Sequence, residues 1–241
     1  MSEEPPRRRM VKPPGGGTEG RSLGARLKTA EGRTPSSQRW LERQLNDPYV
    51  QRAKAEGWRS RAAFKLIEID DQLHLLRRGA RVVDLGAAPG GWVQVALKRG
   101  AAAVAGVDLL AMEPIPGATL LQADFTEAGV GDQLLAALGG PPTVVLSDMA
   151  QNTMGHRATD HLKIVALIEA AADFAVANLA PGGAFVAKAF QGGETKAVLA
   201  SLKAAFAEVR HVKPKASRQD SSEVYLVATG RRASAPRDAS L

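Results

Sequence analysis

The sequence contains no cysteine among its 241 residues. Disulfide bonds, zinc–thiolate sites and cysteine nucleophiles are therefore excluded. It also lacks an apolar run of the ~20 residues that a membrane-spanning helix needs. Three arginines stand at positions 7–9, but no apolar segment follows them, so a secretory signal is not expected. We expect a cytoplasmic protein that makes no membrane contact.

Acidic residues are too few to balance the basic ones. The 25 Asp and Glu residues face 32 Lys and Arg residues, which leaves a formal net charge of +7. Such an excess indicates a polyanionic partner such as RNA or DNA, although a basic surface can also serve solubility alone.

The composition changes along the chain. Residues 1–36 are rich in Pro, Gly, Arg and Ser and hold few large apolar side chains, which predicts a disordered basic tail. The chain as a whole is 44% hydrophobic, enough for the core of one α/β domain. We expect that domain at 37–230 and a short second tail at 231–241.

Residues 80–92 predict a strand, a glycine-rich loop and a helix. Val82 and Val83 suit a short buried strand, and the apolar spacing after about Gly91 suits a helix. The small residues between them would let a ligand contact the backbone at the start of the helix. The glycine spacing matches neither G-x-G-x-x-G nor a P-loop, so a different nucleotide-like cofactor is indicated.

Three further predicted strands, at 102–108, 119–124 and 143–148, each end in an acid. Asp108, Asp124 and Asp148 would therefore lie near the edge of a parallel sheet where cofactors bind, and an acid there commonly accepts hydrogen bonds from ribose hydroxyls. Each one alone could instead cap the following helix. Residues 149–158 read as a mobile loop over the site.

Seven strands are expected in all, with crossover helices between most of them. They are the run at Val82–Val83, then 102–108, 119–124, 143–148, 184–190, 208–213 and 223–229. This order predicts an α/β fold with a mostly parallel sheet and a last strand that is antiparallel. A helix is expected at 61–76 with Ser60 as its N-cap, and Phe206 is expected to face inward from a later helix.

Four polar residues stand where the local pattern calls for packing or for a strand end: Lys65, Asp148, Lys188 and Glu223. Lys188 interrupts an apolar strand, where a charge is costly unless it reaches a crevice or a partner. This Lys–Asp–Lys–Glu set resembles the tetrad of RNA ribose 2′-O-methyltransferases. The segments 60–66, 84–92, 107–110, 147–150, 188–192 and 222–228 are similar to those of FtsJ/RrmJ-type ribosomal RNA methyltransferases.

The resemblance covers roughly residues 37–230, with one departure at 150–152, where the family often has proline before asparagine. It implies a class I (Rossmann-like) methyltransferase sheet with helices on both faces and S-adenosylmethionine as cofactor. It also implies methylation of a uridine 2′-hydroxyl in 23S rRNA of the large ribosomal subunit. We expect a monomer without a metal site, although the sequence does not determine the oligomeric state. The residues implied for the cofactor are Gly90, Trp92, Asp108, Asp124 and Asp148, with Asp108 at the ribose and Asp124 on the adenine side.

The resemblance places Lys188 at the target hydroxyl, with Lys65 and Glu223 beside it. A lysine accepts a proton only when it is neutral, which is rare at pH 7. Burial and Lys65 would favour the neutral form, whereas Asp148 and Glu223 would oppose it. The sequence therefore leaves open whether Lys188 is a general base or orients the hydroxyl. It also leaves open a tRNA or mRNA-cap substrate, and a catalytically silent RNA-binding ribosome assembly factor.

Overall fold

A computed structural model describes residues 38, 45–150, 157–191, 195–218 and 221–233. The chain divides into two units, Met1–Asp47 and Pro48–Leu241. The predicted tail at 1–36 lies outside the described residues, as do most of the predicted loop at 149–158 and residues 234–241 of the second tail. The fold below is that of the second unit.

The second unit is built on a seven-stranded sheet with the order β3-β2-β1-β4-β5-β7-β6. The strands are β1 (Arg81–Leu85), β2 (Ala103–Asp108), β3 (Ala118–Gln122), β4 (Val144–Ser147), β5 (Ala184–Phe190), β6 (Phe206–Val212) and β7 (Glu223–Arg231). The first five strands pair in parallel, and β7 runs antiparallel to both β5 and β6. The prediction of a mostly parallel sheet with an antiparallel last strand is confirmed.

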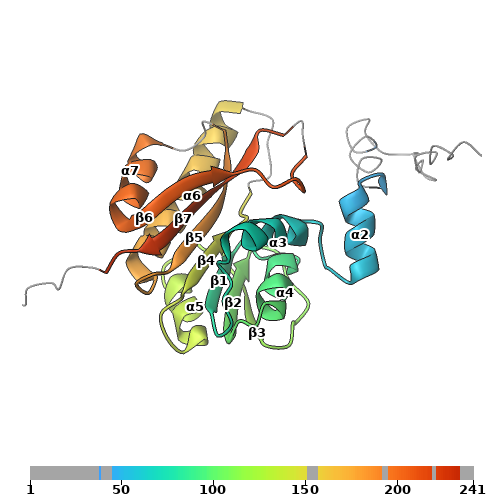
Figure 1. Ribbon diagram of the computed structural model, residues 1–241, viewed down its shortest axis with the longest axis horizontal. Coiled ribbons are helices and arrows are strands. Elements are labelled where there is room, and N and C mark those ends of the chain that lie inside the picture. Colours follow the sequence, from blue (N-terminus) through green and yellow to red (C-terminus); the bar gives the residue numbers. More distant parts are fainter. Residues whose placement is uncertain (1–37, 39–44, 151–156, 192–194, 219–220, 234–241) are drawn as a thin grey trace, which may run out of the picture. The chain divides into compact units, whose positions relative to one another are not determined.

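Helices cover both faces of this sheet (Figure 1). The covering helices are α3 (Ala62–Leu73), α4 (Gly91–Lys98), α5 (Val130–Leu138), α6 (Arg157–Asn178) and α7 (Lys196–Ala205), whereas α2 (Pro48–Glu56) packs against α3. In β1, Val82 packs with α3 and α4, whereas Val83 and Leu85 pack with α5, α6 and α7. This alternation follows from the two-residue period of a strand that is buried on both faces.

Helix α3 is shorter than the predicted 61–76. It ends at Leu73, because His74 adopts a left-handed conformation with φ 53° and its N–H bonds to the carbonyl of Asp70. The side chain of Asp70 also accepts the Leu76 N–H at 2.7 Å, which fixes the turn after the helix. At the other end the N-cap position belongs to Arg61, so the prediction of Ser60 as N-cap is wrong.

Two other boundaries differ from the prediction. The sequence suggested only that Pro48 breaks a helix, but Pro48 is the first residue of α2, a position where the missing N–H of proline costs nothing. Phe206 was expected on the inner face of a helix. It is instead the first residue of β6, buried in the same core, because an apolar side chain at the end of α7 suits either element.

Candidate active site

The glycine loop after β1 needs glycine at two positions. Gly86 has φ 79°, and a Cβ there would lie 2.8 Å from the backbone of Met149. Gly90 has φ 105°, and a Cβ there would lie 2.6 Å from Ile115 Cδ1. Gly90 also occupies the N-cap of α4 without any side-chain cap, so the first N–H groups of this helix face the loop.

Arg59 holds this loop in place. Its guanidinium donates hydrogen bonds to the carbonyl oxygens of Pro89 at 3.2 Å, Glu113 at 2.6 Å and Pro114 at 2.9 Å. One side chain thus ties the glycine loop to the connection between β2 and β3. Sequence reasoning did not single out Arg59, because its partners are backbone carbonyls far along the chain.

Asp108 lies at the end of β2, beside β1, as predicted. Its carboxylate accepts the Ala88 N–H and the Leu110 N–H, each at 2.9 Å. Asp108 therefore joins the glycine loop to the start of the next loop. Leu109 and Leu110 are both well exposed beside it.

Asp84 was not among the site residues predicted from the sequence. It is fully buried in β1, and neither carboxylate oxygen has a hydrogen-bond partner in the part of the chain that the structure describes. Burial raises the pKa of this carboxyl well above its ordinary value, and the charges of Asp148 and Asp108 raise it further. The available signal was its position: β1 lies between β2 and β4, where the strand order reverses.

The hydrogen bonds of Asp124 are local. Its Oδ1 accepts the Thr126 backbone N–H at 2.9 Å and the Thr126 hydroxyl at 2.7 Å, which lowers the pKa of the carboxyl. The side chain closes its own turn and does not cap the following helix, whose N-cap is Gly129. Its place on the adenine side of a cofactor stays a prediction.

Trp92, another predicted cofactor residue, is almost completely buried. Its Nε1 donates to the carbonyl of Ala62 at 2.8 Å, and its ring packs against Tyr225 with centroids 5.7 Å apart. The indole therefore connects α4 to α3 and packs beside Tyr225. Direct contact between Trp92 and a cofactor also stays a prediction.

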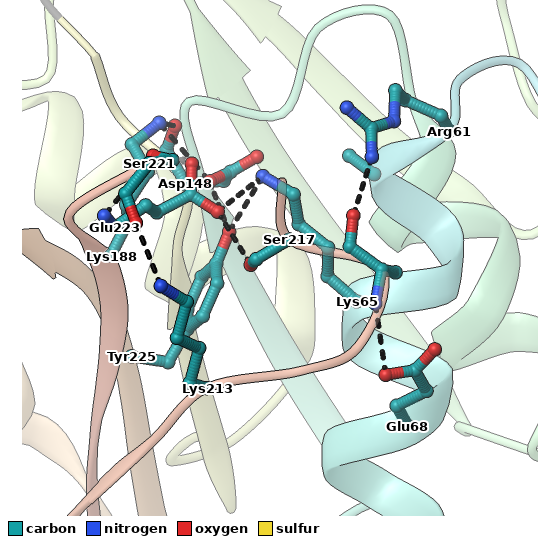
Figure 2. Close-up of polar contacts among 12 residues, drawn as sticks. Arg61, Lys65, Glu68, Asp148, Lys188, Lys213, Ser217, Ser221, Glu223 and Tyr225 are labelled. Atoms are coloured by element: carbon teal, nitrogen blue, oxygen red, sulfur yellow. Dashed lines mark hydrogen bonds and ion pairs between the residues drawn. The ribbon is translucent and has the colours of Figure 1, made fainter. Parts of the chain in front are cut away.

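The four predicted catalytic residues come together at the carboxyl-terminal edge of the sheet (Figure 2). Lys65 Nζ lies 2.7 Å from Glu223 Oε1, and Lys188 Nζ lies 3.1 Å from Asp148 Oδ1. Lys188 Nζ also donates to the carbonyl oxygen of Asp148 at 2.6 Å. The four side chains, called the tetrad below, are between 10% and 18% exposed, so a substrate can still reach them.

Tyr225 connects the two ion pairs of the tetrad, as Figure 2 shows. Its hydroxyl accepts from Lys65 Nζ at 3.1 Å and donates to Asp148 Oδ1 at 3.0 Å. Burial, together with the charges of Asp148 and Glu223, raises the pKa of this phenol well above its ordinary value, so the hydroxyl keeps its proton. The sequence did not indicate a role for Tyr225. Its place beside the tetrad follows from the register between β5 and β7, in which Tyr225 lies opposite Lys188.

The segment between β6 and β7 supports the tetrad from the side of α3 (Figure 2). The backbone of Ala216 donates to Glu68 Oε2 at 3.1 Å and accepts from Arg61. The next residue, Ser217, is buried and donates through Oγ to Glu223 Oε1 at 2.9 Å. Glu223 Oε1 thus receives both Lys65 and Ser217.

This sheet order, with a glycine loop after β1 and acids at the ends of β1 and β2, defines a class I methyltransferase. Among the described residues no group of three His, Asp or Glu side chains is placed to hold a metal ion. No helix in the described ranges is long and apolar enough to cross a membrane.

Comparison with known proteins gives a family. The sequence profile of the FtsJ-like methyltransferases matches residues 58–231. A relative from Caulobacter vibrioides, called ribosomal RNA large subunit methyltransferase E, is 63% identical over 222 residues, which are 92% of this chain and 98% of the relative. A relative of the same name from Granulibacter bethesdensis is 61% identical over 88% of this chain and 92% of its own length.

A solved structure agrees with these relatives. A Plasmodium falciparum protein described as a ribosomal RNA methyltransferase has a TM-score of 0.64 and 31% identity, and the match covers 73% of this chain and all of that one. The chain belongs to the FtsJ-like methyltransferase family.

Proposed function

We propose that this protein methylates the 2′-hydroxyl of a uridine in 23S rRNA within the large ribosomal subunit, with S-adenosylmethionine as the methyl donor. The observation that carries the proposal is the tetrad beside the glycine loop, at the sheet edge where cofactors bind. The names of the relatives support rRNA as the substrate. The domain at 37–230 would act as a cytoplasmic monomer.

The residues around the glycine loop suit this cofactor. S-adenosylmethionine carries a positive sulfonium and a positive ammonium group, and the unpartnered carboxylate of Asp84 would complement positive charge. Gly90 and the start of α4 leave backbone atoms accessible, and Asp108 would accept from the ribose hydroxyls. When bound, the cofactor supplies a methyl group on a cationic sulfur.

The tetrad would align and deprotonate the target hydroxyl. Methyl transfer is an in-line displacement, so alignment of the attacking oxygen contributes much of the rate. An ammonium group has three donors. In Lys188 two of them meet the Oδ1 and the carbonyl of Asp148, which leaves the third for the 2′-oxygen. This supports an orienting role for Lys188 within the Lys188–Asp148 pair. Because an ammonium has no acceptor, the hydroxyl proton would pass to the carboxylate of Asp148.

Lys65, Glu223 and Tyr225 would hold that pair in place. Tyr225 donates to the same Oδ1 that Lys188 contacts, and Lys65 links Tyr225 to Glu223. The network has two ammonium groups and two carboxylates, so its charges balance in a crevice that excludes most water.

The function is tested by an assay with a tritiated methyl donor. Large ribosomal subunits lacking the modification, free tRNA and capped RNA are compared, and the product nucleoside is identified. We expect label mainly in the large subunit, as 2′-O-methyluridine. Label mainly in tRNA or in cap nucleotides would contradict the proposed substrate, and no label with any of the three RNAs would favour a silent binding protein.

Asp108→Ala is expected to weaken S-adenosylmethionine binding by about 1.5–3 kcal/mol, the usual cost of losing hydrogen bonds to a charged group. Calorimetry measures the affinity, and a melting curve checks that the variant folds. Asp173→Ala is the control, since Asp173 is an exposed acid on α6. Unchanged affinity in a folded Asp108→Ala protein would remove Asp108 from the cofactor site.

Ser217→Ala is expected to lower kcat by about 2- to 10-fold, below the full cost of a lost hydrogen bond to a charged carboxylate. The reason is that Glu223 Oε1 would keep Lys65 but lose the Ser217 hydroxyl. The KM for RNA and the cofactor affinity should stay unchanged, and Ser217→Thr should retain most of the activity. Steady-state kinetics with wild-type kcat in Ser217→Ala would show that this contact does not position Glu223.

A further inference from the structure

A cavity of about 600 Å³ lies at the amino-terminal ends of the parallel strands, and the tetrad lies at their carboxyl-terminal ends. Its walls include Ala80, Thr143 and Gly183, which directly precede β1, β4 and β5. The tetrad lies beyond the other ends of these strands. Along β5 alone, the four residue steps from Ala184 to Lys188 span about 13 Å. The cavity is therefore separate from the active site described above.

The charged side chains that line the cavity are mainly basic. Arg77 and Arg78 come from the connection between α3 and β1, and Arg210 comes from β6. Glu208 is the one acid among the described lining residues, and it pairs with Arg210. Three guanidinium groups against one carboxylate leave the cavity with a positive charge, and the imidazole of His74 adds a further hydrogen-bonding group.

The donors in this cavity are available to a ligand. Arg77 and Arg78 are exposed, and neither side chain has an acidic partner among the described residues. Arg210 Nε is buried and has no hydrogen-bond partner in the described part of the chain. Two other arginines near the same end of the sheet already have partners. The guanidinium of Arg81 donates to the carbonyl of Pro141, and that of Arg231 donates to the carbonyl of Val176.

Basic residues also lead from the cavity toward the tetrad. Arg210 is followed on the same strand and its continuation by Lys213, a step of about 10 Å. Lys213 Nζ donates to the carbonyl oxygen of Ser221. The hydroxyl of Ser221 accepts the backbone N–H of Glu223. A polyanion that reaches from the active site along β6 would therefore meet positive charge at both ends.

We propose that this cavity binds a backbone phosphate of the RNA substrate, away from the ribose that is methylated. The proposal rests on the proposed function, because RNA is its ligand. Arginine forks suit phosphate oxygens, and contacts to phosphate do not require the fixed geometry of a base edge. A free nucleoside polyphosphate shares this phosphate chemistry, so the experiment separates the two sources.

The experiment compares two doubly substituted full-length proteins, each of which lowers the net charge from +7 to +5 (7 − 2 = 5). Arg77→Gln/Arg78→Gln removes the two unpaired guanidinium groups from the cavity. Lys196→Gln/Lys203→Gln, on the exposed surface of α7, is the control. Methyl transfer to large ribosomal subunits is measured over a range of salt concentrations, and cofactor binding is measured by calorimetry.

The cavity variant is expected to have a KM for the large subunit about 10-fold higher at moderate salt, because both guanidinium contacts to the phosphate are lost. The slope of log KM against log salt should be shallower by roughly 0.7–0.9, the value for one phosphate. The kcat and the cofactor affinity should be unchanged, and Arg77→Lys/Arg78→Lys should recover most of the loss because the charge is kept. The control variant should keep the wild-type KM and slope.

Four results would overturn the proposal. The first three are an unchanged KM in the cavity variant, an equal rise in KM in both variants, and a fall in cofactor affinity or melting temperature that explains the effect. A fourth is binding of ATP to the wild type that the cavity variant loses while its KM for RNA stays the same, since the cavity would then hold a free nucleotide. In each case methylation by the wild type still supports the proposed function, whereas an inactive wild type contradicts that function itself.

Discussion

Lys188→Ala is expected to reduce methyl transfer by about 100-fold or more, the range for loss of a group that orients or deprotonates the nucleophile. In the structure Lys188 is held by two oxygens of Asp148, and the proposed target hydroxyl would take its remaining donor. Cofactor affinity should change little, because the acids around the glycine loop remain. Activity is measured with tritiated methyl donor and large subunits, and binding by calorimetry.

Lys188→Arg should not restore activity. A guanidinium is planar, always protonated and wider than an ammonium, so it cannot occupy the same place between the Oδ1 and the carbonyl of Asp148. Lys196→Ala on α7 serves as the control for loss of one exposed lysine. An active Lys188→Ala enzyme would contradict the assignment of the tetrad, and so would an inactive one that has also lost its cofactor.

Asp84→Asn is expected to make the protein more stable at neutral pH and to weaken cofactor binding. Burial raises the pKa of Asp84 in the folded state, whereas in the unfolded chain it is about 3.9. The folded protein therefore holds this proton more tightly than the unfolded chain. The contribution of this proton to the free energy of unfolding is fully present below the pKa of Asp84 in the unfolded chain. It is lost as the pH rises through the pKa of Asp84 in the folded protein.

Asparagine has nearly the same shape as aspartate but does not ionise. The melting temperature of Asp84→Asn should exceed that of the wild type at pH 7 by several degrees, since ~1–2 kcal/mol shifts a domain of this size by about 2–8 °C. It should also fall less than that of the wild type between pH 4 and pH 8. Thermal unfolding over this range measures both effects, with Asp173→Asn as the exposed control.

The cofactor should respond in the opposite direction. A cationic ligand favours the ionised form of Asp84, so the affinity of the wild type for S-adenosylmethionine should rise with pH through the folded pKa and then level off. Asp84→Asn should bind roughly 10- to 100-fold more weakly, as for a lost charge interaction in a buried site. A pH-independent wild-type affinity, or full affinity in the variant, would show that Asp84 does not face positive charge.

Local patterns in the sequence determined most of the fold. The β-branched run at Val82–Val83 and the glycine loop after it lie within a few residues of one another, so their structure depends on local sterics and hydrophobic period. The acid at the end of β2 could be read in the same way. Each tetrad residue could also be recognised singly, because a charge among apolar neighbours violates the local pattern.

Only the tertiary structure decided which of these groups meet. Lys65 and Glu223 are 158 residues apart (223 − 65 = 158), and their contact depends on how α3 packs beside β7. The bridge through Tyr225 depends on the register between β5 and β7. That Asp84 has no hydrogen-bond partner among the described residues depends on every element packed around it. Hydrophobic period states which face of an element is buried, but a side chain's partner is set by register and packing between elements that are distant in the sequence.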